Sequence, residues 1–116
     1  LDLDTPAAGE LFVQGRVDVG AGPQRFDDVF GAGWRLVTDG AAAVPDDLAQ
    51  WFTSIGGRIV GVGDGVGDGT DAADVDGTYR RWFDDHAVTA AVQRPDFAVF
   101  ASGDPASLLA DLRRRL

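Results

Sequence analysis

Hydrophobic residues near the middle of the chain recur at the spacing of an α-helix. The stretch opens at Pro45-Asp46 and stops at Gly56-Gly57, and both pairs are typical of helix ends. Its apolar positions fall at i, i+3, i+4 and i+7 and so share one face: Leu48, Trp51, Phe52 and Ile55. The short apolar run Arg58–Val62 follows, as expected for a buried parallel strand. These residues predict a helix that leads directly into a central strand.

The segments before and after this predicted helix and strand also carry patterns typical of helices and strands. Arg25–Gly31 predicts a short helix with three apolar residues on one face: Phe26, Val29 and Phe30. Trp34–Thr38 is rich in β-forming residues and ends at Asp39-Gly40, which predicts a strand. A further helix is expected to start near Asp76, with an aromatic face of Tyr79, Trp82 and Phe83. The Gly- and Asp-rich residues Gly63–Asp74 are predicted to form a loop before it.

The last third of the chain predicts a β-hairpin and a helix. The β-rich runs Ala87–Gln93 and Phe97–Ala101 flank Arg94-Pro95-Asp96, and three residues between two such runs are typical of a hairpin. Asp104-Pro105 is expected to start the final helix, with Asp as N-cap and Pro at the first helical position. Its apolar side carries Leu109, Leu112 and Leu116, and Arg113–Arg115 lie where the helix dipole favours cations.

The resulting order β-α-β-α-β-β-α predicts one α/β domain with a thioredoxin-like core. The first β-α-β unit is expected to be a right-handed parallel crossover and the final pair antiparallel. The predicted sheet is therefore mixed, with four strands in the order 2-1-3-4 and helices on both faces. Residues 1–22 are predicted to be an extended N-terminal arm outside the sheet, with one strand at Leu11–Val13, and residues 23–116 the thioredoxin-like domain.

The composition limits which binding partners and which cellular location are expected. Nineteen acidic and ten basic residues give a net charge of −9, which disfavours nucleic acid and anionic membranes as partners. No apolar run approaches the roughly 20 residues that a membrane span needs. No secretory signal is visible and there is no cysteine, so a cytoplasmic location is expected. The chain starts at Leu1 and contains no Met, which indicates a piece of a longer protein.

We expect no catalytic centre in this chain. The stretch from Thr38 to Pro45, where a thioredoxin has its reactive thiol, holds no Cys, and Asp85-His86-Ala87 stands where thioredoxins have a proline. His86 is the single histidine, and the three serines have no Gly-x-Ser-x-Gly context. We therefore predict no redox or hydrolase centre, and interpret His86 as a capping or surface residue.

The Gly/Asp-rich residues 63–77 suggest a site for a nucleotide phosphate or for calcium, but they fit the sequence pattern of neither site well. The positions three after Gly63, Gly65 and Gly67 are not Gly, so the dinucleotide pattern Gly-x-Gly-x-x-Gly fails, and a P-loop needs a Lys that the chain lacks. Calcium is an alternative because Asp is dense here, but an EF-hand from Asp64 would have Val66 and Val75 at ligand positions. A solvated loop is the favoured interpretation.

From Asp74 onward the chain reads DVDGTYRRWFDDHAVTAAVQRPDFAVFASG. This segment resembles the end of flavin-dependent aromatic-ring hydroxylases of the 3-(3-hydroxyphenyl)propionate hydroxylase and phenol hydroxylase type. The residues that carry the resemblance are Asp74, Asp76, Gly77, Tyr79, Trp82, Phe83, Arg94, Pro95 and Asp96. A looser similarity extends over about residues 10–103. One departure is Phe97, because the family usually has Gly after Arg-Pro-Asp, and Gly tolerates a positive φ that Phe does not.

The resemblance implies an accessory domain without chemistry of its own. In that family the terminal domain is similar to thioredoxin without its cysteines, and FAD, NAD(P)H and the substrate are bound by the preceding domains. We expect no cofactor in this chain, and a role in packing against those FAD-binding and substrate domains or in subunit contacts of a homo-oligomer. The alternatives are a free-standing, redox-inactive thioredoxin-like binding module and a calcium-dependent module.

A structural or interface role is expected for Asp76, Gly77, Tyr79, Trp82, Arg94, Pro95 and Asp96. Pro95 fixes a turn in which Asp96 can accept main-chain N–H bonds. Arg94 is expected to pair with Asp96 or with a carboxylate on a neighbouring helix, or to reach across an interface.

Overall fold

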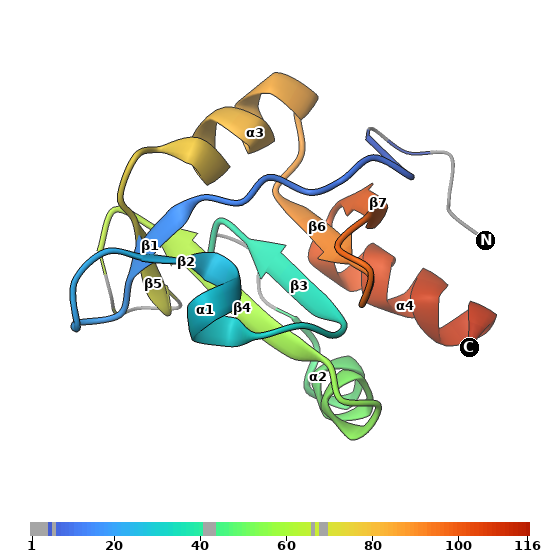
Figure 1. Ribbon diagram of the computed structural model, residues 1–116. Coiled ribbons are helices and arrows are strands. Elements are labelled where there is room, and N and C mark those ends of the chain that lie inside the picture. Colours follow the sequence, from blue (N-terminus) through green and yellow to red (C-terminus); the bar gives the residue numbers. More distant parts are fainter. Residues whose placement is uncertain (1–4, 6, 41–43, 66, 68–69) are drawn as a thin grey trace.

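The computed structural model describes residues 5, 7–40, 44–65, 67 and 70–116. The chain forms one mixed sheet with helices on both faces, in the strand order β2-β1-β5-β4-β3-β6-β7 (Figure 1). The prediction of an α/β fold with a mixed sheet flanked by helices is confirmed. The predicted number of strands is wrong, because the sheet has seven strands and not four.

The four predicted strands form one half of the sheet. They are β3 (Arg35–Thr38), β4 (Arg58–Gly63), β6 (Ala90–Gln93) and β7 (Val99–Gly103). β3 pairs with β4 in parallel, β3 with β6 antiparallel, and β6 with β7 antiparallel. Strand β6 starts three residues later than predicted because α3 extends to His86 and Ala87 ends it in a left-handed conformation, with φ 55°.

Three short strands extend the sheet beyond β4: β1 (Arg16–Asp18), β2 (Gln24–Arg25) and β5 (Ala72–Asp74). β5 lies within the predicted loop Gly63–Asp74 and pairs with β4 in parallel, Val62 opposite Ala72. Each of these strands has only two or three residues, and Ala and Asp are poor strand formers, so their pairing comes from the neighbouring strand and not from a local pattern.

The N-terminal arm is not outside the sheet. Its strand β1 pairs with β5 and β2, and Val17 is completely buried. The predicted strand Leu11–Val13 is also wrong, because only Leu11 forms a bridge there, to Ala98 beside β7. The arm therefore reaches both ends of the sheet. Residues 1–4 and 6 of the arm lie outside the described residues.

Two apolar layers enclose the sheet. One lies between the sheet and α1 (Phe26–Phe30), α3 (Thr78–His86) and the arm. The other lies between the sheet and α2 (Asp46–Ser54) and α4 (Pro105–Arg115), the two helices on the opposite face. Alternation along β3 sends Val37 into the first layer and Leu36 into the second. Leu109 and Leu112 of α4 are buried as predicted, but Leu116 is 65% exposed. Among the described residues, no helix has the length and apolar character to span a membrane.

Candidate functional site

Four residues selected from the sequence lie on α3 or just before it, and three of them, Asp76, Tyr79 and Trp82, contact the N-terminal arm. Gly77 precedes the helix in a left-handed conformation, with φ 69°, and Asp76 stands just before it. Tyr79 and Trp82 point from the helix into the first apolar layer. Sequence reasoning identified these residues, but the contacts of Asp76, Tyr79 and Trp82 with the arm could not be predicted because the arm was expected to lie apart.

Tyr79 binds the arm from inside the core. Its side chain is completely buried, and its hydroxyl oxygen accepts the main-chain N–H of Gly15 at 3.1 Å. A Cβ at position 15 would lie only 2.7 Å from Cε2 of Tyr79, so the contact requires glycine. Burial raises the pKa of Tyr79 far above its ordinary value. The phenol is therefore a neutral hydrogen-bond partner and not a proton donor or acceptor for chemistry near neutral pH.

Asp76 binds the arm from outside. Its carboxylate receives two hydrogen bonds from Arg16, Nε–Oδ2 at 2.8 Å and Nη2–Oδ1 at 2.7 Å. These bonds lower the pKa of Asp76 below its ordinary range. Both side chains are about half exposed, at 56% and 42%, so the pair contributes more to the register of the arm than to its stability.

Phe12 joins this motif to the aromatic core. Its ring lies 5.8 Å from that of Tyr79 and meets Trp82 edge-on at 5.0 Å, measured between centroids. Trp82 in turn stacks on His86 at 4.2 Å, and His86 Nδ1 donates to the Trp82 carbonyl at 2.7 Å. His86 thus closes the last turn of α3.

The other three selected residues form the β6–β7 turn. Arg94 pairs with Asp96 through Nε–Oδ1 at 3.0 Å and Nη2–Oδ2 at 2.6 Å, which lowers the pKa of Asp96. Asp96 also accepts the N–H of Ala98 at 3.2 Å. Of the partners considered for Arg94, the structure thus shows Asp96. Pro95 is exposed between them.

Phe97 closes this turn in a left-handed conformation, with φ 69°. Its N–H donates to the Arg94 carbonyl at 2.9 Å. A side chain other than glycine in this conformation costs about 1–2 kcal/mol. The departure noted in the sequence is therefore a strained residue on an otherwise ordinary hairpin.

The arm connects the two groups of selected residues. Phe12, which packs on Tyr79 and Trp82, donates its N–H to the Phe97 carbonyl at 2.9 Å. Val99 donates to the Glu10 carbonyl at 2.7 Å, and Gly9 donates to the Val99 carbonyl at 2.8 Å. The contacts of these motifs therefore hold the chain's own N-terminal segment in place.

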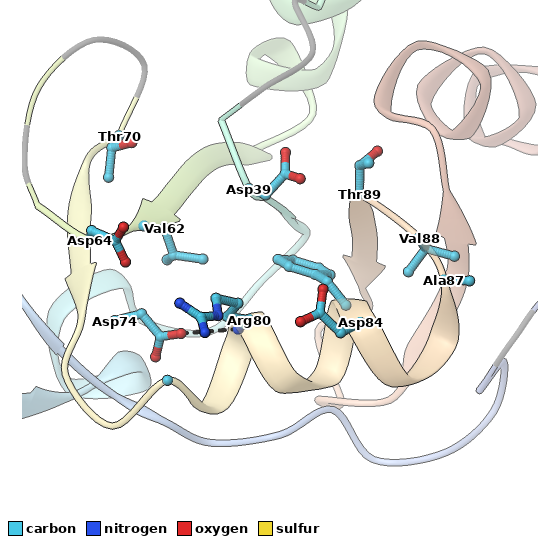
Figure 2. Close-up of a pocket in the computed structure, with 13 residues that line it drawn as sticks. Asp39, Val62, Asp64, Thr70, Asp74, Arg80, Asp84, Ala87, Val88 and Thr89 are labelled. Carbon is cyan, nitrogen blue, oxygen red and sulfur yellow. Dashed lines mark hydrogen bonds between the residues drawn. The ribbon is translucent and has the colours of Figure 1, made fainter.

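A pocket of about 610 Å³ lies beside α3, where β3, β4 and β5 end. Its floor is apolar, with Val62, Phe83 and Val88, and its rim carries four carboxylates: Asp39, Asp64, Asp74 and Asp84. Figure 2 shows Arg80 between Asp74 and Asp84, with its main-chain N–H bound to Asp74 at 3.0 Å. Because carboxylates outnumber the single Arg, the rim disfavours a diphosphate. The pocket was missed because its residues come from five separate segments.

The calcium hypothesis finds no support among the residues that the structure describes, where no group of three or more His, Cys, Asp or Glu could hold a metal ion. Asp68, one of the loop carboxylates, lies outside those residues. Asp71 is used within the fold, since its carboxylate accepts the Gly61 N–H at 2.8 Å.

Arg35 is a buried residue that sequence reasoning missed. It is 8% exposed, and its guanidinium donates to the carbonyls of Phe30 at 2.7 and 3.0 Å, Ala32 at 2.8 Å and Trp34 at 2.8 Å. Burial lowers the pKa of Arg35, and the charge of Arg58 lowers it further. The signal in the sequence was an Arg in an otherwise apolar strand after Gly31 and Gly33. This cation holds the α1–β3 loop in place.

Comparison with known proteins gives one family and several relatives. The model of the HcaD C-terminal domain family matches residues 9–115. A probable NADH-specific resorcinol 4-hydroxylase of Rhodococcus jostii (strain RHA1) is 37% identical over 112 residues, which cover 93% of this chain and 21% of that protein. The chain thus spans about a fifth of the length of this relative.

Solved structures show the same fold at lower identity. The flavin-dependent monooxygenase PieE, solved with FAD and substrate, matches 92% of this chain and 19% of its own, with a TM-score of 0.62 and 21% identity. The anhydrotetracycline hydroxylase OxyS of Streptomyces rimosus matches 89% of this chain and 18% of its own, with a TM-score of 0.54 and 23% identity. At these identities the likeness shows the fold alone.

Proposed function

This chain belongs to the HcaD C-terminal domain family, and on that premise we propose that it is the C-terminal accessory domain of a flavin-dependent aromatic-ring hydroxylase. The observation that carries the proposal is the 37% identity to a probable resorcinol hydroxylase of which this chain covers 21%. On this proposal the domain contributes structure to a cytoplasmic monooxygenase, and the remaining part of that enzyme performs the reaction.

The contacts within the domain support a structural role. Tyr79 and Asp76 bind the arm, and Arg94 pairs with Asp96 inside its own turn. We further propose that β4-β3-β6-β7 with their helices form a thioredoxin-like core, residues 23–116, on which the N-terminal residues 1–22 are added. Such a core without cysteine cannot perform thiol–disulfide exchange.

We propose that FAD and NAD(P)H bind to the preceding part of the enzyme. A dinucleotide needs a tight glycine turn at the start of a helix, where main-chain N–H groups hold the pyrophosphate. The Gly-rich segment of this chain lacks that spacing, and the nearby pocket carries four carboxylates. Both features favour a domain that does not bind the flavin itself.

The test uses the 116-residue chain and a longer chain that contains it. The 116-residue chain is expected to melt cooperatively and to leave the fluorescence of added FAD unchanged. The longer chain is expected to purify with about one FAD per protomer and to oxidise NADH or NADPH in the presence of a phenolic substrate. Micromolar FAD binding by the 116-residue chain, or a longer chain without flavin, would overturn the proposal.

A further inference from the structure

We propose that the edge where the arm meets the β6–β7 turn is the surface that docks on the flavin-binding part of the enzyme. We call this surface the arm–hairpin patch and define it by Leu11, Arg94, Pro95, Asp96 and Phe97. The inference rests on the proposed function, because it takes the preceding part of that enzyme as the partner. Three observations support it.

The first observation is the exposure of Leu11. Its side chain is 76% exposed, the highest value among the described large apolar residues, and it belongs to neither apolar layer. Its main chain is nevertheless held, because hydrogen bonds to Val99 and Phe97 fix the neighbouring residues Glu10 and Phe12. An apolar side chain on a fixed backbone loses little entropy when it becomes buried in an interface.

The second observation is Phe97 on the adjacent segment. Its backbone is strained, at φ 69°, and its half-buried ring also belongs to neither apolar layer. Glycine would satisfy the turn without strain, so the strain is the cost of carrying a side chain at this position. Strained residues of this kind cluster at functional sites, including sites of binding.

The third observation is the path of the chain. Gly9 donates to the Val99 carbonyl at 2.8 Å and Thr5 Oγ1 accepts the N–H of Ser102 at 3.0 Å, so the described residues of the N-terminal segment run along β7 from the β6–β7 turn toward its other end. The chain covers only 21% of its hydroxylase relative, and its family is that of a C-terminal domain. On the proposed function, the preceding part of the enzyme joins the domain through its N-terminal segment and covers Leu11 and Phe97 on the same edge of the sheet.

The chemistry of the partner surface follows from the patch. Leu11 and Phe97 require an apolar depression, while Arg94 and Asp96, with side chains 30% and 60% exposed, stand beside them as a polar rim. An apolar centre with a polar rim is the usual arrangement of a specific interface.

The experiment uses the longer chain as the purified flavoprotein. Leu11→Asp is expected to release the domain, so that a protease cleaves between the two parts about tenfold faster while FAD stays bound, as for loss of one central apolar contact. Phe97→Gly is expected to have the same effect without disturbing the fold. The matched control is Val19→Asp, since Val19 is 39% exposed on the β1–β2 turn at the other end of the sheet.

Hydrogen exchange provides the second readout. Amides at 9–12 and 97–99 are expected to exchange at least tenfold more slowly in the longer chain than in the 116-residue chain. Equal cleavage of the Leu11→Asp and Val19→Asp variants in a flavin-loaded enzyme would overturn the docking surface and leave the proposed function intact. A longer chain that holds no flavin would overturn both.

Discussion

At the scale of the residue, the main chain of Gly15 lies directly against the buried ring of Tyr79. Gly15→Ala is expected to destabilise the domain by about 1–3 kcal/mol, because the added Cβ would lie 2.7 Å from Cε2 of the buried ring. Urea unfolding measures the loss. Gly65→Ala is the matched control, since nothing lies within 4 Å of a Cβ at that position. Equal effects of the two substitutions would contradict the close contact.

Tyr79 also gives the domain a defined sensitivity to alkali. Its pKa is raised in the folded state, so the stability tied to the neutral phenol is complete below the unfolded value of about 10 and is lost as pH rises above it. It is the single tyrosine, so absorbance at the tyrosinate band reports on it alone. We expect this absorbance to rise together with unfolding measured by circular dichroism. Ionisation of a still folded chain near pH 10 would disprove the burial.

Phe97 allows backbone strain to be separated from side-chain packing. At an ordinary position Ala is more stable than Gly, but at φ 69° the order should reverse. We expect Phe97→Gly to be more stable than Phe97→Ala by about 1 kcal/mol, since both lose the same ring. Thermal melts of the two variants measure the difference. If the Ala variant were the more stable, the left-handed turn would be wrong.

At the scale of the element, α4 begins at an N-cap residue whose own side chain accepts a main-chain N–H of the first turn. Asp104 Oδ2 accepts the N–H of Ser107 at 3.0 Å, with Pro105 at the first helical position. Asp104→Ala is expected to cost about 1 kcal/mol, and Asp104→Asn much less, because the amide oxygen can still accept the bond. Chemical denaturation of both variants tests this. A similar loss for both would assign the effect to charge and not to the cap.

Elements with a strong apolar period could be predicted from the sequence, and elements made by pairing could not. Phe52 on α2 and Leu109 on α4 are buried at the positions that their spacing indicates. Strand β5, by contrast, reads Ala-Ala-Asp and exists because β4 offers it a free edge. Arg35 shows the same limit at the candidate site. Its partners are main-chain carbonyls, and because every residue has one, the sequence does not indicate which of them Arg35 binds.

At the scale of the whole molecule, charge opposes compactness. The net charge is −9, so mutual repulsion of carboxylates should destabilise the folded state at low ionic strength. Raising NaCl from about 0.02 to 0.5 M is expected to raise Tm by roughly 4 °C, which corresponds to about 1 kcal/mol in a domain of this size. KCl should act equally. A fall in Tm would mean that ion pairs such as Arg16–Asp76 dominate instead.

The arm also decides when the fold can be completed during synthesis. Its partners lie far along the chain, with Asp76 60 residues after Arg16 and Ser102 97 residues after Thr5. A ribosome adds about 5–20 residues per second, so the arm leaves it several seconds before α3 and β7 exist. During that interval Phe12 and Val17, later buried, have no partner surface. The first segment of the domain to be made is thus among the last to find its place, and the domain completes its fold only after the β6–β7 hairpin has left the ribosome.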